Sequence, residues 1–129
     1  MRMQTRERVF TLGEAVMIQP EKENGRGPRL EAAAARLHEA RPEATILLFG
    51  SQARGDARAD SDADFLVVLP QPPRSTRREM VELADRLRPL HIAADVLVVS
   101  AKRFRESAAV PGTLYHAALR EGKVLYGRL

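Results

Sequence analysis

Apolar residues between positions 28 and 40 follow the spacing of one helical face. The i, i+3, i+4, i+7 pattern is formed by Leu30, Ala33, Ala34 and Leu37. Pro28 suits the first turn of a helix, where an N–H group would have no partner, and Pro42 stops the pattern shortly after its end. We therefore expect a helix over residues 28–40.

A second helical pattern lies between positions 76 and 90. Its apolar stripe consists of Met80, Leu83, Ala84, Leu87 and Leu90. Thr76 and Glu79 have the spacing of a capping box, which predicts the first turn at this point. Shorter helices are expected over residues 101–107 and 114–120. The helix that begins near position 76 is long enough to cross over between two parallel strands.

Short aliphatic and β-branched runs, bounded by polar or turn residues, alternate with these helices. They cover residues 45–49, 65–69, 92–99 and 124–126. This alternation favours an α/β (α+β) domain built on a single small mixed β-sheet with flanking helices, at least partly parallel. Ligands of such sheets gather at loops that follow the C-terminal ends of strands, so the loop after residue 49 is a candidate site.

The length of 129 residues is typical of one domain. Residues 1–27 mix charges with a short apolar stretch, and their last part is rich in Pro, Gly and charged residues, as in a linker. We therefore expect an N-terminal arm over residues 1–27, loosely attached, and a single folded domain over residues 28–129.

The composition excludes several kinds of site. The chain has no cysteine and only three scattered histidines, which excludes disulfides, thiolate zinc sites and Cys nucleophiles, so that any metal must be held by oxygen. No apolar run approaches the ~20 residues that span a bilayer, and we expect a cytoplasmic protein with no membrane contact. The net charge of +4 rests almost entirely on arginine, which suits phosphate binding.

Two aspartates open the second strand. Asp62 and Asp64 alternate along the chain, so they share one face of the strand with their attachment points about 6 to 7 Å apart. Two carboxylates at that distance repel by roughly 2 to 3 kcal/mol at an effective dielectric constant near 20. A divalent cation reverses the sign of that energy, and one or two carboxylates plus substrate phosphate oxygens are the ligands that Mg²⁺ prefers.

The other candidate residues follow the first strand or lie in the third. Gly50 allows close backbone approach, and a helix beginning near Ser51 would hold a phosphate with its free N–H groups, with Arg54 one turn further on. Asp95 is the only charge in the apolar run 92–99, where a buried carboxylate needs a cation or an arginine. If the second and third strands are neighbours, Asp95 lies about 5 Å from the Asp62 and Asp64 face.

These residues resemble a known family. Gly50-Ser51, ten further residues, Asp62-x-Asp64 and a later strand aspartate form the pattern of the DNA polymerase β-like nucleotidyltransferases, and the short chain is similar to their minimal nucleotidyltransferase branch. The resemblance covers roughly residues 28–126. Ala53, Arg54, Gly55 and Ser61 also agree with the extended motif, whereas Gln52 stands at a position that is often basic or aromatic.

The resemblance implies a role for each residue. The turn at Gly50 and Ser51, with Arg54, binds the phosphates of the nucleotide, Asp62 and Asp64 hold Mg²⁺, as one or two ions, and Asp95 helps to bind metal and to activate the attacking hydroxyl. The implied reaction is attack by an acceptor hydroxyl on the α-phosphorus of a nucleoside triphosphate, with ATP as the expected substrate and pyrophosphate as the leaving group.

The acceptor is implied by the resemblance as well. The minimal enzymes resemble the antitoxin half of toxin–antitoxin pairs that silence a HEPN-domain ribonuclease by attaching AMP to its tyrosine. Larger relatives carry an additional substrate-binding domain, for which this chain has no room after the sheet is built, so a separate partner protein is expected. A homo-oligomer is compatible with the sequence.

Other functions stay open at this point. The chain could neutralise a partner by binding alone, or transfer a nucleotide to a small molecule or RNA. Arginines on and around the helix at 76–90 could bind nucleic acid, which a steep dependence of affinity on salt would reveal. The near absence of aromatic residues outside the core argues against the stacking of single-stranded bases.

Overall fold

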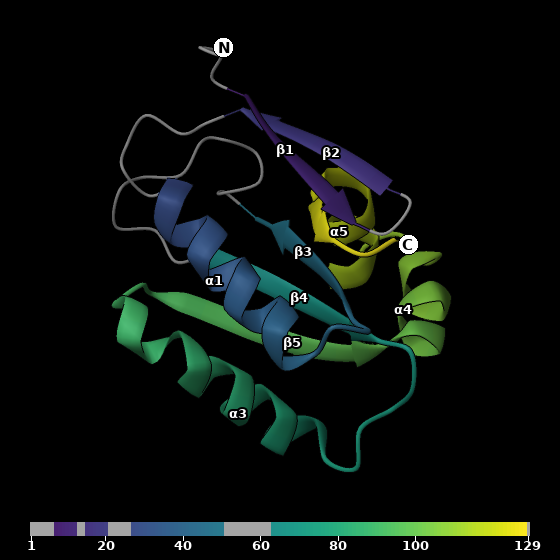
Figure 1. Cartoon of the computed structure of the whole chain (residues 1–129). Helices are drawn as coiled ribbons and strands as arrows, with labels where there is room; N and C mark the ends of the chain where they lie inside the picture. Colours follow the sequence, from purple (N-terminus) through teal and green to yellow (C-terminus); the bar gives the residue numbers. More distant parts are fainter. Residues whose placement is uncertain (1–6, 13–14, 21–26, 51–62, 129) are drawn as a thin grey trace.

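The computed structural model describes residues 7–12, 15–20, 27–50 and 63–128, and its helices and strands after residue 26 follow the order that the sequence predicts (Figure 1). In chain order they are β1 (Glu7–Leu12), β2 (Ala15–Pro20), α1 (Gly27–Ala40), β3 (Thr45–Phe49), β4 (Ala63–Leu69), α3 (Thr76–Leu87), the 3₁₀ turn η1 (Arg88–Leu90), β5 (Ala94–Ser100), α4 (Ala101–Ala108), α5 (Leu114–Glu121) and β6 (Lys123–Tyr126).

Four strands form one mixed sheet in the order β5-β4-β3-β6. β4 and β5 are parallel and are joined through the crossover helix α3, whereas β3 runs antiparallel to both of its neighbours, β4 and β6. The mixed α/β fold expected from the alternation of elements is therefore confirmed. Because β3 is antiparallel to β4, its C-terminal end lies beside the N-terminal ends of β4 and β5.

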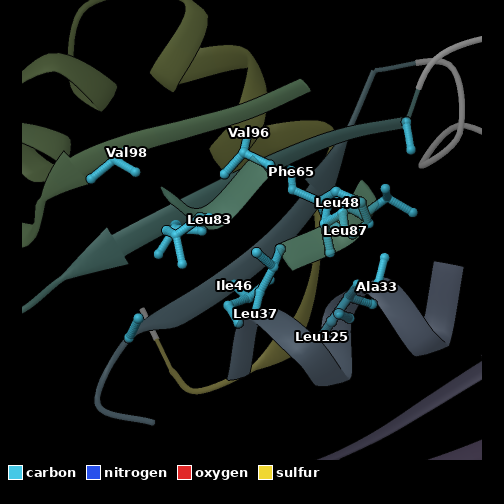
Figure 2. Close-up of a cluster of buried hydrophobic side chains, with 14 of the residues drawn as sticks. Ala33, Leu37, Ile46, Leu48, Phe65, Leu83, Leu87, Val96, Val98 and Leu125 are labelled. Carbon is cyan, nitrogen blue, oxygen red and sulfur yellow. The ribbon is translucent and has the colours of Figure 1, made fainter. Parts of the chain in front are cut away.

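Helices cover both faces of the sheet (Figure 1). α1 and α3 pack on one face, where Leu37 and Leu83 meet Phe65 of β4 in a cluster of buried side chains (Figure 2). α4 and α5 pack on the other face, where Phe104 and Ala118 meet alternate strand residues. The side-chain alternation of a strand accounts for this division, since successive residues of β4 point to opposite faces.

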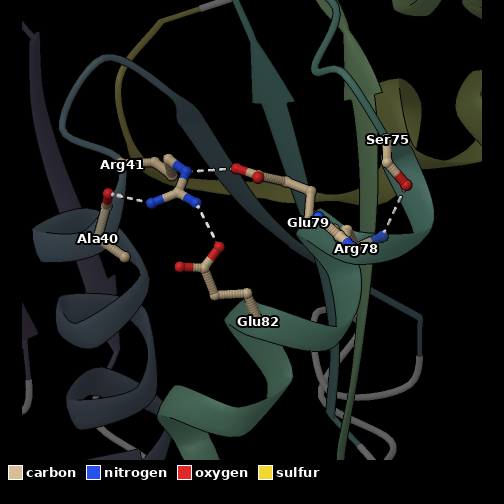
Figure 3. A network of polar contacts seen from close by, with 6 residues as sticks. All are labelled: Ala40, Arg41, Ser75, Arg78, Glu79 and Glu82. Atoms are coloured by element: carbon tan, nitrogen blue, oxygen red, sulfur yellow. Dashed lines mark hydrogen bonds and ion pairs between the residues drawn. The ribbon is translucent and has the colours of Figure 1, made fainter.

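The start of α3 differs from the expected capping box. Ser75, not Thr76, is the N-cap, and its side chain accepts a hydrogen bond from the backbone N–H of Arg78. Glu79 faces α1 instead, where its carboxylate binds the guanidinium of Arg41 just after the end of that helix (Figure 3). Arg41 also binds Glu82 at 3.0 Å, so one side chain ties the end of α1 to α3.

The described part of the N-terminal arm contains two strands. β1 and β2 pair in an antiparallel hairpin in which Val9 is the register partner of Ile18, and β1 lies next to β6, one of the two edge strands of the main sheet. Across the described ranges of the chain, no helix is long and apolar enough to span a bilayer.

Candidate functional site

One row of residues crosses the sheet where β3 ends and β4 and β5 begin. Phe49 of β3 is the register partner of Asp64 of β4, and Asp64 is the partner of Asp95 of β5. Register partners on neighbouring strands point to the same face, and the strands lie about 4.8 Å apart. The two carboxylates therefore start from adjacent positions on the face that α4 and α5 cover.

The same face is apolar further along the sheet. The row next to Asp64 contains Leu47, Leu66 and Leu97, and Leu47 and Leu66 are fully buried. Asp64 is half-buried and Asp95 is exposed. The side chains therefore change from apolar to acidic at the point where the buried part of the sheet ends. The fold thus presents two carboxylates at the rim of its core.

Gly50 follows β3 in a conformation that favours glycine. Its φ is +79°, in the left-handed region, and a Cβ atom built on it would lie 2.6 Å from Oδ2 of Asp64. Any other residue would push the carboxylate away or strain the turn. Close approach was expected at Gly50, and within the described residues the group that approaches it is the Asp64 side chain.

The surroundings of Asp95 differ from those expected. The apolar run at 92–99 suggested a buried carboxylate, but β5 begins only at Ala94 and is the edge strand of the sheet, so Asp95 is exposed near the open end of this strand. The argument that burial forces a cation or an arginine on Asp95 is therefore wrong. Its juxtaposition with Asp64, which the sequence predicted if the strands were neighbours, is confirmed.

Three of the predicted site residues, Ser51, Arg54 and Asp62, lie outside the described residues. Within the described ranges, no group of three His, Asp or Glu side chains comes together closely enough to hold a metal ion. Asp64 and Asp95 supply carboxylate oxygens, the donors that suit Mg²⁺, and a site with two carboxylates leaves coordination positions for phosphate oxygens and water. The donor set is therefore compatible with a magnesium ion shared with a nucleotide.

A groove of about 630 Å³ extends from the two carboxylates along β5. Besides Asp64 and Asp95 it is lined by Phe49, Arg77, Met80, Val81, Ala84, Ala94, Val96, Leu97 and Leu114. Arg77, Val81 and Leu114 were not recognised as site residues from the sequence. Val81 and Leu114 are large apolar side chains with exposed fractions of 54% and 46%, a signal that the sequence alone does not contain.

Two histidines, His38 and His116, and both tyrosines lie in packing positions, whereas His91 is exposed. The ring of His38 stacks on that of Tyr126 with centroids 4.3 Å apart, and Nδ1 of His116 lies 2.8 Å from the carbonyl oxygen of Ala108. Tyr115 packs edge-on against Phe104. These contacts are packing contacts, and none of them involves Asp64 or Asp95.

A family model decides the class to which this arrangement belongs. The model for the nucleotidyltransferase domain matches residues 30–119, a segment that includes both carboxylates and Gly50. The chain belongs to the nucleotidyltransferase domain family. The enzyme class implied by the pattern of Gly50-Ser51, Asp62-x-Asp64 and Asp95 is thereby confirmed, and so is the nucleotidyltransferase fold. No curated protein sequence matches the chain significantly.

Solved structures share the fold of this nucleotidyltransferase domain. A toxin–antitoxin crystallised with AMP-PNP is 25% identical, with a TM-score of 0.56, over 76% of this chain and 73% of that chain. A mutant of the toxin–antitoxin MntA-HpeT is 23% identical, with a TM-score of 0.53 and the same coverage. A protein assigned as a nucleotidyltransferase from Sulfolobus solfataricus is 19% identical, with a TM-score of 0.54, over 78% of this chain and 79% of that chain.

Proposed function

We propose that this nucleotidyltransferase transfers AMP from ATP, with Mg²⁺, to the hydroxyl of a tyrosine on a HEPN-type toxin partner. The observation that carries the proposal is the pairing of Asp64 with Asp95 beside the Gly50 turn, within the matched family domain. The similarity to a toxin–antitoxin crystallised with AMP-PNP supports both an adenine nucleotide as substrate and a toxin as partner.

The reaction assigns separate tasks to the residues. Asp64, with Asp62, would hold the Mg²⁺ ion, and Ser51 and Arg54, which follow Gly50 in the sequence, would bind the triphosphate. A bound Mg²⁺ supplies positive charge that stabilises the charge developing on the phosphate oxygens. Asp95 would share the ion and orient the acceptor hydroxyl.

The transfer exchanges one phosphorus–oxygen bond for another. The acceptor oxygen forms a bond to the α-phosphorus, and the bond from that phosphorus to the oxygen that bridges to the β-phosphate breaks, so that pyrophosphate leaves. The proton of the hydroxyl passes to the carboxylate of Asp95, which lies on the exposed side of the site, where a partner can approach. Asp64 is the more enclosed of the two, which suits a ligand that stays on the metal.

Transfer of label from α-phosphate-labelled ATP tests this proposal. The native chain is incubated with Mg²⁺ and with the protein and RNA fractions of an extract from its host, beside Asp62→Asn, Asp64→Asn and Asp95→Asn. Asp85→Asn is the matched control, because Asp85 is an exposed carboxylate on α3 that pairs with Arg88, outside the site. A protein band labelled by the native chain and by Asp85→Asn, and absent with the three site variants, is the expected result.

The position and identity of the label test the finer statements. Phosphatase-resistant AMP on a tyrosine of a HEPN-type protein supports the proposed acceptor, and label on RNA or on a small molecule would contradict it. If no triphosphate gives label in any fraction although the chain binds Mg²⁺ and nucleotide, a neutralising role by binding alone replaces catalysis.

A further inference from the structure

The outer edge of β5 carries backbone groups that point away from the sheet. β5 is the last strand in the sheet order, and in the described part of the chain no strand pairs with its outer side. The backbone N–H of Ala63 donates a hydrogen bond to the carbonyl of Ala93, which fixes the direction of alternate groups. By that alternation the backbone N–H and C=O groups of Asp95 and Leu97 face β4, whereas those of Ala94, Val96 and Val98 face outward.

Apolar side chains line both sides of this edge. Met80, Val81 and Ala84 of α3 lie on one side, and Leu97 with Leu114, the first residue of α5, lies on the other. Val81 and Leu114 account for two of the four exposed large apolar residues of the described chain, and both line this groove. In the described ranges β5 is thus an edge strand between two apolar walls, and an added β-strand occupies such an edge in peptide recognition.

The two ends of the groove differ in charge. At one end lie Asp64 and Asp95, and the groove is continuous with them. Arg77 lines the groove one turn before Val81 on α3, is exposed, and has no ion pair with any residue in the ranges that the structure describes. A ligand that follows the groove therefore meets the positive charge of Arg77 as well as the proposed metal site.

We propose that the acceptor hydroxyl is presented by an extended polypeptide segment of a partner protein, which adds to the outer edge of β5 as a further strand. This inference rests on the proposed function, because the segment places its hydroxyl beside Asp95. The side chains of the added segment alternate between two faces. Those on the face that carries the hydroxyl lie against Leu97 and Leu114, and those on the other face lie against Met80 and Val81. An acidic side chain of the segment pairs with Arg77.

The groove fits a polypeptide better than a nucleic acid. Single-stranded RNA binds through aromatic stacking and several phosphate contacts. Among the described residues that line this groove the one aromatic is Phe49, which is 8% exposed, and the one cation is Arg77. The backbone groups of β5 that face outward between apolar walls match the hydrogen-bonding needs of an extended chain instead.

Transfer of label to protein tests the inference with a matched pair of variants. Val81→Asp places a charge in the groove, and Val110→Asp places it at an equally exposed valine outside the groove, with exposed fractions of 54% and 52%. The probe is α-phosphate-labelled ATP with Mg²⁺ and the protein fraction of a host extract. We expect Val81→Asp to reduce protein labelling at least tenfold with Mg²⁺–ATP affinity unchanged, and Val110→Asp to label as the native chain does.

Charge reversal gives a second pair. Arg77→Glu should lower labelling by a similar factor, whereas Arg86→Glu, an exposed arginine of the same helix that does not line the groove, should leave it unchanged. With the labelled protein purified, its addition should slow amide hydrogen exchange at Val96 and Val98, the outward-facing positions of β5.

The outcomes separate the two proposals. Full labelling by Val81→Asp, or an equal loss in Val110→Asp, overturns the docking inference while transfer itself stands. Label on RNA with none on protein overturns it in favour of a nucleic-acid acceptor, and unchanged exchange at Val96 and Val98 overturns the strand geometry. A native chain that labels nothing overturns the proposed function and the docking inference together.

Discussion

Gly50 and Asp64 lie so close together that a Cβ atom on the glycine would stand 2.6 Å from Oδ2 of the carboxylate. The contact joins the turn after β3 to the start of β4, the two segments between which the family's motif runs. It exists because β3 and β4 are antiparallel, with Phe49 and Asp64 as register partners. The position of a carboxylate proposed to bind metal therefore depends on a residue with no side chain.

Gly50→Ala should remove transfer activity and destabilise the fold. The added Cβ displaces the Asp64 carboxylate, and the left-handed φ adds a backbone cost, about 1 to 3 kcal/mol in unfolding free energy by urea denaturation. Gly112→Ala is the control, because Gly112 also has a positive φ, +92°, but nothing within 4 Å of an added Cβ. It should cost about 1 kcal/mol and keep native activity. Equal activity losses in both variants would contradict the role of the Asp64 contact.

Asp95→Asn should stabilise the protein without metal and weaken its response to Mg²⁺. Like charges at directly opposite positions of neighbouring strands are destabilising, and Asp64 and Asp95 are register partners, so removing one charge should gain roughly 0.5 kcal/mol. Mg²⁺ should raise the melting temperature of the native chain, because a ligand that binds the folded state alone stabilises it.

Thermal melts with and without Mg²⁺, at low salt, check this prediction. Asp85→Asn, at an exposed carboxylate of α3, should keep the native response to Mg²⁺. A melting temperature of Asp95→Asn that still rises with Mg²⁺ as much as the native value would show that Asp95 does not share the ion.

Most of the fold was predictable because its signals are local. The helix at α1 follows from a spacing of apolar residues within 14 positions, and β3 from a run of five. The crossover helix α3 and the parallel pairing of β4 with β5 follow from element order, since parallel strands need such a connection. That Asp64 and Asp95 lie next to each other followed from that pairing.

The exposure of Asp95 and the groove beside it were not predictable in the same way. An apolar run such as 92–99 is compatible with a central or an edge strand, and the choice depends on the order of all four strands. The groove needs Val81 of α3 and Leu114 of α5 on opposite sides of β5, a relationship between residues distant in sequence.

The N-cap of α3 was not predictable either, because adjacent Ser75 and Thr76 are both good caps. Glu79, which was expected in the capping box, instead binds Arg41, a residue distant in sequence.

Arg41→Met should destabilise the protein by about 1 to 3 kcal/mol in urea denaturation. The side chain of Glu79 is 14% exposed, so loss of the guanidinium leaves a largely enclosed carboxylate without its partner. The bond to Glu79 raises the pKa of Arg41 above its usual range, and the Glu79 and Glu82 charges add to this. Arg88→Met is the control, because Arg88 and Asp85 form an exposed pair and should change stability by less than about 0.5 kcal/mol.

A double-mutant cycle with Glu79→Gln isolates the Arg41–Glu79 interaction. Arg41→Met alone and Glu79→Gln alone should each lower the free energy of unfolding by more than the same change does when the other is already present. The reason is that in the double variant no unpaired charge is left behind. Additive costs would contradict the coupling of α1 to α3 through this ion pair.

Tyr126→Phe should flatten the loss of stability at alkaline pH. Burial of the ring, with the charges of Glu31 and Glu39 nearby, raises the pKa of Tyr126 above its usual range. The folded state therefore favours the neutral phenol more strongly than the unfolded state does. This contribution is fully present below the unfolded pKa of about 10 and is lost as the pH rises from there through the higher folded pKa. Unfolding free energies measured between pH 8 and pH 11, by urea denaturation of both proteins, should fall more steeply above about pH 10 in the native chain. Parallel curves would mean that the ring stacked on His38 titrates alike in the folded and unfolded chains.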